Sequence, residues 1–300
     1  GQKQKMGELK IETPIEVLFE GADENIYKKT KDIPETVSST LDNIKENFCF
    51  LYVGHWLRGD LGQDRKDTGM LVKVFLETFK NVKNPPGLIM KTSGATFSII
   101  DREECLSKLR DIKSTVKGRL PNIYLMHGDF SDDEMNQLYN HPKVKAHVSL
   151  THGEGFGRPL LEATMSEKPI MASNWSGHLD FLKKPNALLI GGALEDVKKG
   201  SFPDDFYIDG VKWFTVNYQE ASATMKELYK NYRKYTLGAK KLATYNKAKF
   251  SLDAMTRQLG KILDKYVPEF PKEVKLQLPK LKKVGSTETP KIKLPKLKKV

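Results

Sequence analysis

The sequence predicts an α/β protein built on a doubly wound parallel sheet. From Phe48 onward, short apolar runs alternate with segments whose apolar residues recur at helical spacing. The short runs are near-continuously apolar, as are strands that helices cover on both faces. Repeated strand–helix alternation also requires right-handed crossovers, which place helices on both sides of one parallel sheet. Ligands of such sheets bind beyond the carboxyl ends of the strands, so the candidate site is sought there.

The predicted elements follow one another along the chain. Before the sheet we expect a strand at Ile15–Phe19, a turn at Gly21–Asp23 and a helix at Glu35–Asn47. The expected strands are Phe48–Val53, Gly87–Lys91, Asn122–Met126, Ala146–Leu150, Pro169–Ser173, Ala187–Ile190 and Lys212–Val216. The expected helices between them are Gly69–Lys80, Asp101–Lys113 and Ser131–Tyr139, the last opened by a capping box of Ser131 and Glu134.

The C-terminal part of the chain changes in character. Residues Gly191–Gly210 are expected to form an irregular insertion, and Ala221–Val267 two helices broken near Thr236–Gly238. The sequence KLQLPKLKKV at 275–284 returns as KIKLPKLKKV at 291–300. Frequent prolines and dense like charge forbid a packed core, so residues 268–300 are predicted to be a disordered tail rich in lysine and proline.

Charge and composition exclude several classes of function. The formal net charge is +12, but residues 269–300 hold ten lysines and three glutamates, which leaves about +5 on the body. A nucleic-acid partner is therefore not expected, and the tail is either a solvated segment or an arm for a polyanion. No run approaches the roughly 18 apolar residues of a membrane span. Two cysteines and no apolar leader indicate a cytoplasmic protein.

The densest chemical signal is the segment 152–163, which reads HGEGFGRPLLEA. It follows a predicted strand and enters a helix with Pro159 near the first helical position, where a missing N–H costs nothing. Its glycines let the backbone approach a ligand, and the free N–H groups of a helix start suit an anion such as phosphate. Glu154 and Glu162 can face one pocket as acceptors for sugar hydroxyls. The dinucleotide fingerprint is excluded, because Arg158 stands where its third glycine would be.

These motifs resemble those of the glycosyltransferase group 1 family, the retaining GT-B transferases that use sugar nucleotides. Glu154 and Glu162 form the E-x7-E pair, and KPIMASNWSGH follows at 168–178. The resemblance runs from about Pro14 to Tyr235 and implies the C-terminal, donor-binding domain. It implies that Glu162 binds the ribose, that Glu154 lies against the sugar, and that the backbone between them meets the sugar and diphosphate. The residues expected there are Gly155, Phe156, Gly157 and Arg158.

The resemblance also implies a basic pair that grips the diphosphate after the first strand of the domain. Gly54 ends that strand, and Lys66 matches the family lysine best, with Arg65 or Arg58 as the arginine. An arginine suits a bidentate grip on phosphate, and a lysine acts as a point charge. The loop is longer than the usual family form, and an ordinary charged surface loop is the alternative. We expect Glu154, Arg65 and Lys66 to be the catalytic residues.

Further residues at the carboxyl ends of predicted strands are candidates for the donor site. They are Lys91, Gly128, Thr151 and His152. Each is equally open to a purely structural role in a turn. No histidine cluster and no D-x-D motif is present, so no metal and no cofactor is expected, and the nucleotide diphosphate sugar is the substrate. Helix dipoles and basic side chains then stabilise the leaving diphosphate.

The sequence predicts a glycosyltransferase that moves a hexose to an unknown acceptor, with retention implied by the resemblance alone. The alternative is a non-catalytic module that binds a nucleotide sugar, with a tail that binds a polyanion. The expected domains are a linker and remnant of an N-terminal domain at 1–47, the donor-binding domain at 48–267 and the tail at 268–300. The acceptor-binding domain of the family has no counterpart here, so a separate domain or subunit is expected to supply it.

Overall fold

The computed structural model has the predicted doubly wound parallel sheet, with six of the seven predicted strands in it. The model describes residues 13–57, 61–94, 96–202 and 208–268, so the predicted tail lies almost wholly outside the described residues. The strands are β1 (Cys49–His55), β2 (Gly87–Ser93), β3 (Ile123–Met126), β4 (Val144–Ser149), β5 (Ile170–Ser173) and β6 (Leu188–Ile190). Their order is β3-β2-β1-β4-β5-β6, and every neighbouring pair is parallel.

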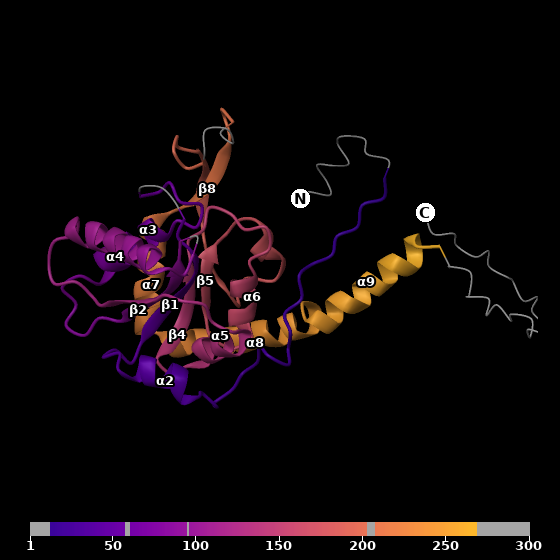
Figure 1. The fold of residues 1–300 in the computed structure, drawn as a ribbon, viewed down its shortest axis with the longest axis horizontal. Coiled ribbons are helices and arrows are strands. Elements are labelled where there is room, and N and C mark those ends of the chain that lie inside the picture. Colours follow the sequence, from indigo (N-terminus) through magenta and orange to yellow (C-terminus); the bar gives the residue numbers. More distant parts are fainter. Residues whose placement is uncertain (1–12, 58–60, 95, 203–207, 269–300) are drawn as a thin grey trace, which may run out of the picture.

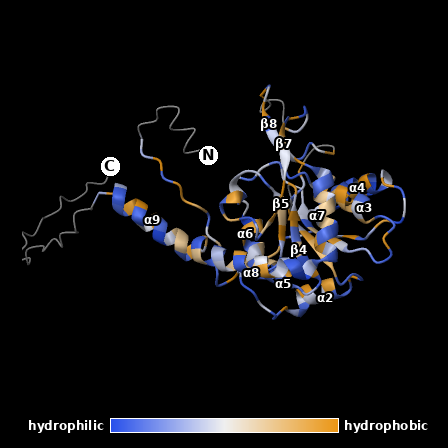
Figure 2. Cartoon of the chain, turned by 180° about the vertical axis from the view of Figure 1, so that it is seen from behind, coloured by the Kyte–Doolittle hydropathy of each residue, from blue (hydrophilic) through white to orange (hydrophobic). Residues whose placement is uncertain are grey.

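Helices cover both faces of this sheet (Figure 1). One face packs on α3 (Thr68–Phe79), α4 (Ile99–Ser114) and α7 (Tyr218–Lys230). The other packs on α2 (Glu35–Asp42), α5 (Asp132–Asn140), α6 (Arg158–Thr164) and α8 (Tyr232–Lys249). Alternate residues of β1 serve the two cores, because successive side chains of a strand point to opposite faces. Phe50 and Tyr52 enter the first core, and Cys49 and Leu51 enter the second. Figure 2 shows the hydrophobic residues gathered on the strands between the helix layers.

Local sequence signals place several of these elements. The predicted capping box is present, with Ser131 Oγ accepting from the Glu134 N–H and the Glu134 carboxylate accepting from the Ser131 N–H. Ser98 and Asn217 cap α4 and α7 in the same way through their side-chain oxygens. Such caps satisfy N–H groups that have no partner inside the helix. The helix starts therefore agree with the doubly wound fold that the strand pattern predicts.

The seventh predicted strand does not join the main sheet. Lys212–Val216 is β8, which pairs antiparallel with β7 (Gly192–Asp196) in a separate two-stranded ribbon. The predicted irregular insertion 191–210 therefore begins with a strand. β8 has the apolar pattern of a core strand because Phe214 and Val216 pack into the first core and Trp213 stacks on His152, although the strand pairs only with β7. Figure 1 shows β8 rising from the carboxyl edge of the main sheet.

The C-terminal region forms three helices where two were predicted. The breaks fall at Asn231 and at Phe250–Ser251, after which α9 (Leu252–Tyr266) begins. The predicted break near Gly238 is wrong, since that residue lies inside α8. A Cβ on Gly238 would lie 3.3 Å from the Cα of Asn186, so the glycine allows close packing and does not end the helix.

The predicted strand Ile15–Phe19 is also not formed. Residues 13–21 instead run beside α9, which extends from the body in Figure 1. Gln258 Nε2 donates to the Val17 carbonyl at 2.6 Å, and Lys265 Nζ pairs with the Glu16 carboxylate at 2.9 Å. Phe19 packs against Phe250, between α8 and α9, while Val17 and Leu18 remain exposed. Within the described ranges, no helix has the length and apolar character to cross a membrane.

Candidate functional site

The candidate site lies where the strand order of the sheet reverses. Strands β1 and β4 are neighbours in the centre, and the chain leaves them toward opposite edges. In open α/β sheets the crevice at this point, beyond the carboxyl ends, is the usual place for a ligand. The loops that meet there are the one after β1, described at residues 56–57 and 61–67, and the one at 150–157, after β4. They contain most of the residues singled out from the sequence.

Backbone contacts join these two loops. The His152 N–H donates to the Arg65 carbonyl at 3.0 Å. Thr151 Oγ1 lies 3.2 Å from the same carbonyl oxygen and 3.1 Å from that of Gly153. Thr151, a predicted binding residue, is fully buried, and its hydroxyl connects the two loops from inside the fold. The backbone of Arg65 is thereby fixed against the glycine-rich segment.

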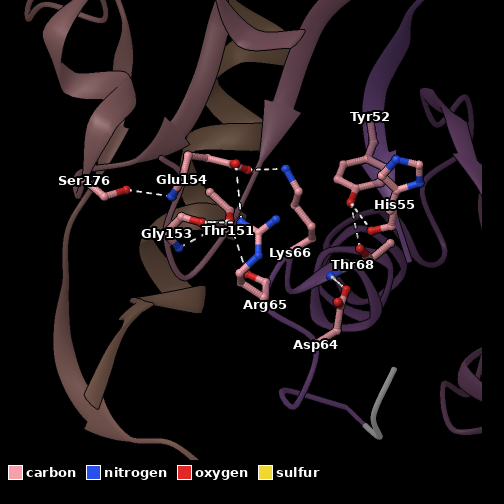
Figure 3. A network of polar contacts seen from close by, with 10 residues as sticks. All are labelled: Tyr52, His55, Asp64, Arg65, Lys66, Thr68, Thr151, Gly153, Glu154 and Ser176. Carbon is pink, nitrogen blue, oxygen red and sulfur yellow. Dashed lines mark hydrogen bonds and ion pairs between the residues drawn. The ribbon is translucent and has the colours of Figure 1, made fainter. Parts of the chain in front are cut away.

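Three predicted catalytic side chains meet above this junction (Figure 3). Lys66 Nζ lies 2.5 Å from Glu154 Oε1. Arg65 Nη1 donates to the Gly153 carbonyl at 2.6 Å and lies 3.4 Å from Glu154 Oε2. The side chains of Lys66 and Glu154 are 15% and 10% exposed, whereas that of Arg65 is 47% exposed. Two cations thus face one carboxylate at the mouth of the crevice, which leaves one positive charge in excess.

The turn after β5 holds the backbone of Glu154. Its N–H donates to Ser176 Oγ at 2.8 Å, as Figure 3 shows, and its carbonyl accepts from the Gly177 N–H at 3.1 Å. A Cβ on Gly177 would lie 1.9 Å from the Gly155 carbonyl oxygen, so only glycine fits there. The Ser-Gly turn of the sequence motif therefore supports the loop that carries Glu154.

The glycine-rich segment has free space beside its backbone at Gly155. A Cβ on Gly155 would meet nothing within 4 Å. Gly157 has φ +95° and stands immediately before α6, a backbone conformation that glycine adopts without strain. The Phe156 ring packs on Phe181 at a centroid distance of 5.1 Å, so only its backbone can face a ligand. Within the described part of the chain, the N–H groups of Gly155, Phe156 and Gly157 have no hydrogen-bond partner.

Glu162 lies one turn into α6 and has partners of its own. Its side chain is 8% exposed, with Oε1 3.2 Å from Arg158 Nη2 and Oε2 accepting from the Tyr139 hydroxyl at 3.3 Å. Burial raises the pKa of this carboxyl, while Arg158 opposes the shift. Arg158 itself, a predicted binding residue, is held at the surface by this ion pair. The two glutamates of the E-x7-E pair are thus fixed by separate groups of residues.

Lys91 and Gly128 also come together. Lys91 Nζ donates to the Gly128 carbonyl at 2.6 Å and lies 4.6 Å from the centroid of the Phe130 ring. Lys91 is 9% exposed, and burial lowers the pKa of its ammonium group. Gly128 has φ +131° and open space where a Cβ would be. The two predicted residues therefore form one corner at the carboxyl ends of β2 and β3.

Other predicted residues serve the packing of the site. A Cβ on Gly54 would lie 2.7 Å from the hydroxyl of Tyr52, which is hydrogen-bonded to Thr68 Oγ1 (Figure 3). His152 is 3% exposed and stacks on Trp213 with 3.9 Å between ring centroids. Arg58 lies outside the described residues.

Two residues beside the site, Asp67 and Tyr218, were not predicted from the sequence. Asp67 is fully buried, has φ +52° and accepts from the Tyr218 hydroxyl at 2.7 Å. Its place directly before α3 is a signal for a helix cap, but its side chain makes no capping bond. Across the described ranges, no three or more His, Cys, Asp or Glu side chains are grouped so that they could hold a metal ion.

This chain matches solved structures of known proteins. No protein-family model and no curated protein matches the sequence. The C-terminal domain of a glycosyl transferase group 1 family protein (LpcC) from Francisella tularensis matches with a TM-score of 0.52 and 14% identity, over 77% of this chain and 100% of that one. Anabaena Alr3699/HepE in complex with UDP-glucose matches with a TM-score of 0.56 and 17% identity. Sucrose-phosphate synthase from Thermosynechococcus elongatus matches with a TM-score of 0.59 and 13% identity.

The coverage of these matches locates the likeness within one part of the larger proteins. The matches include 83% of this chain and 57% of HepE, and 88% of this chain and 56% of the synthase. The chain thus spans little more than half the length of either protein. The LpcC domain, by contrast, is matched over its whole length. The chain has the fold of the C-terminal domain of GT-B glycosyltransferases of group 1.

Proposed function

We propose that this chain binds a nucleotide diphosphate sugar and is the donor-binding half of a glycosyltransferase. The observation that carries the proposal is the meeting of Arg65, Lys66 and Glu154 beside the open glycine-rich segment, at the reversal of strand order. Cations beside free backbone N–H groups suit a diphosphate, and a carboxylate beside them suits sugar hydroxyls. The fold adds support, because a ligand of such a sheet enters at this crevice.

Binding the diphosphate involves an exchange of partners at the mouth of the crevice. Lys66 and Arg65 are paired with the Glu154 carboxylate. A diphosphate draws both cations toward its oxygens and leaves Glu154 to accept from the sugar hydroxyls. The cations then neutralise the charge that develops on the leaving diphosphate, which is the largest contribution such a site makes to the rate.

The glycine-rich segment completes the phosphate site. The N–H groups of Gly155, Phe156 and Gly157 donate to phosphate or sugar oxygens in this proposal. They are positioned in advance, since Gly177 and Ser176 hold the backbone of residues 154 and 155. Donors already aimed at the ligand need no reorganisation when charge develops, and this lowers the barrier more than flexible side chains would.

Glu162 is assigned to the ribose, and the corner of Lys91 and Gly128 to the base. Tyr139 and Arg158 fix the Glu162 carboxylate, and its remaining lone pairs are acceptors for hydroxyl groups. The Lys91 ammonium has three N–H bonds and donates one of them to Gly128. Its other donors suit carbonyl oxygens of a base. Arg158, which pairs with Glu162, is assigned to the ribose end of the ligand as well.

The finer parts of the proposal are the sugar, the stereochemistry and the acceptor. HepE is described in complexes with UDP-glucose and with UDP, which makes a uridine nucleotide and a hexose the first choice here. We further propose transfer with retention, without a metal ion, and an acceptor held by a separate domain or subunit. Orientation of two reactants supplies up to roughly 7–11 kcal/mol of the barrier, so a chain that holds the donor alone should transfer slowly.

A thermal-shift panel tests donor binding directly. The chain is heated with UDP, GDP, ADP and their sugar conjugates, each at several concentrations. A ligand at about 100 times its Kd stabilises the folded state by about 2.7 kcal/mol, an easily measured shift. We expect one nucleoside diphosphate and its sugar conjugates to shift the midpoint, and the others to shift it less. Equal midpoints with all ligands up to millimolar concentration would contradict the proposal.

A further inference from the structure

A second pair of residues joins the same two loops inside the fold. Asp67 follows Lys66, and His152 precedes Gly153, so both are sequence neighbours of the charged cluster. His152 Nε2 lies 3.6 Å from Asp67 Oδ1, and the side chains are 2% and 0% exposed. The ion pairs of Glu154 with Arg65 and Lys66, and the buried pair of Asp67 and His152, therefore both connect the loop after β1 to the loop after β4.

The hydrogen bonds around the inner pair leave one proton to be placed. His152 Nδ1 is 2.8 Å from the Phe214 carbonyl oxygen, which can only accept, so Nδ1 carries a proton. In the neutral imidazole, Nε2 is then an acceptor. Asp67 Oδ2 accepts from the Tyr218 hydroxyl at 2.7 Å, while Oδ1 and His152 Nε2 have no partner among the described residues. Two buried acceptors that face each other require a proton between them.

We propose that Asp67 and His152 share one proton and act as a positioning pair, which holds the Arg65–Lys66 loop against the Gly153–Glu154 loop for nucleotide-sugar binding. The proposal rests on the proposed function for its role in binding, but the shared proton itself does not. Neither residue touches the ligand in this scheme. Their effect passes through the backbone to the cations on one side and to Glu154 on the other.

The surroundings of the pair favour retention of the proton. Burial raises the pKa of Asp67 to about 7, and burial lowers the pKa of the His152 imidazolium. The ionisable groups that face the pair are Tyr218 on α7, Asp64 in the same loop, Glu195 on β7 and Lys198 after it. Asp64 and Glu195 favour the protonated Asp67 carboxyl, whereas the hydrogen bond from Tyr218 and the charge of Lys198 lower its pKa. Trp213, stacked on His152, shields the imidazole from water.

The expected dependence on pH follows from these directions. The pKa of Asp67 in the folded state lies above the unfolded value of 3.8, so the folded chain keeps a proton that the unfolded chain has lost. The contribution of that proton is complete below about pH 3.8 and is lost progressively as pH rises from there through about 7. Above that pH, two acceptors face each other and the loops separate more easily. Nucleotide-sugar affinity should fall over the same range.

The substitution Asp67→Asn tests the shared proton without removing the contact. The amide oxygen accepts from Tyr218, and the amide N–H donates to His152 Nε2 at every pH. We expect wild-type affinity for UDP-glucose, or for the best ligand of the panel, to fall about tenfold from pH 6 to pH 8. Asp67→Asn should keep the pH 6 affinity throughout, whereas Asp67→Ala should lose it at both pH values. Asp42→Asn is the matched control, because Asp42 lies 3.3 Å from the buried His141, outside the two loops of the site.

Thermal midpoints from pH 5 to pH 8.5 provide a measurement that needs no ligand. The difference between Asp67→Asn and the wild type should grow in favour of the variant as pH rises to about 7 and stay constant above it, and Asp42→Asn should show no such trend. An identical pH profile for Asp67→Asn and the wild type would overturn the shared proton. Loss of affinity in Asp67→Asn equal to that in Asp67→Ala would overturn it too. If no nucleotide binds to the wild type, the proposed function fails, and the midpoints still decide the inference; if Asp67→Ala does not fold, the comparison with Asn suffices.

Discussion

Gly177 packs so tightly on Gly155 that a methyl group on the first would lie 1.9 Å from the carbonyl oxygen of the second. This contact fixes one side of the glycine-rich segment against the turn after β5. The opposite situation holds at Gly155, where an added Cβ meets nothing within 4 Å. Two neighbouring glycines therefore have different reasons for being glycine: one is needed for packing, and the other leaves room for a ligand.

Gly155→Ala should leave the thermal midpoint within about 1 °C of wild type and weaken nucleotide-sugar binding by tenfold or more, about 1.4 kcal/mol. Its methyl group enters the space that the proposal assigns to the ligand. Gly177→Ala should lower the midpoint, because the backbone of residue 155 has to move. Gly260→Ala is the control, since that glycine in α9 also has open space around it. Unchanged affinity in Gly155→Ala would show that the ligand lies elsewhere.

Glu162→Gln should weaken nucleotide binding much more than it weakens folding. The amide oxygen can still accept from Tyr139, so the packing is retained, but the charge-assisted bond to a ribose hydroxyl is lost. Such bonds contribute about 1.5–3 kcal/mol, which corresponds to a loss in affinity of at least about tenfold. Isothermal titration of the diphosphate measures the effect, with Glu103→Gln on the exposed face of α4 as control. Equal affinities of variant and wild type would remove Glu162 from the ribose.

Lys66→Met should discriminate between phosphates. The aliphatic stem is retained, while the cation that faces Glu154 is lost. We expect affinity for the nucleoside diphosphate to fall at least about tenfold, in line with a charge-assisted contact, and affinity for the monophosphate to change less. Lys73→Met on α3 is the control, because Lys73 forms no ion pair within the described residues. A parallel loss for both nucleotides would contradict a grip on the diphosphate.

His147→Phe should stabilise the chain in acid. His147 is 2% exposed on β4, both ring nitrogens have no partner among the described residues, and burial lowers its pKa to about 3. The unfolded chain takes up a proton below about pH 6.5 and the folded chain does not, so stability is lost as pH falls from there. At pH 5 the penalty is about 2 kcal/mol. Urea unfolding at pH 5 and pH 8 should show a gain for the variant that is larger at pH 5, and an equal gain at both would be inconsistent with this origin.

Nucleotide binding should not depend on a divalent metal. The charge of the diphosphate is assigned to Arg65, Lys66 and the free backbone N–H groups, so chelation leaves the site unchanged. We expect affinities in EDTA and in magnesium to agree within about twofold, a difference of about 0.4 kcal/mol. A large loss of affinity in EDTA, restored by added magnesium, would show that a metal shares the charge.

The predictable parts of this molecule are those set by local pattern. The strands of the main sheet could be predicted because each is a short apolar run. The start of a helix could be predicted where a capping residue such as Ser131 precedes it. The assignment of Lys66 and Glu154 to one site came from the resemblance to a known family, and the structure brings them together because the loops after β1 and β4 share one edge. The proposed roles of Asp67 and His152 could not be predicted from the sequence. They depend on Trp213 and Tyr218, which are brought there by packing between segments far apart in the chain.

The β7–β8 ribbon gives the site an optical reporter on each side. Trp213 is stacked on His152 at 3.9 Å, and Trp175 is stacked on Phe214 with 5.6 Å between ring centroids and is 40% exposed. Only three tryptophans occur in the chain, and the third, Trp56, is buried directly after β1. All three therefore lie beyond the carboxyl edge of the sheet. Intrinsic fluorescence of the unlabelled chain accordingly reports on the candidate site, and a shift in its emission separates rearrangement there from unfolding elsewhere.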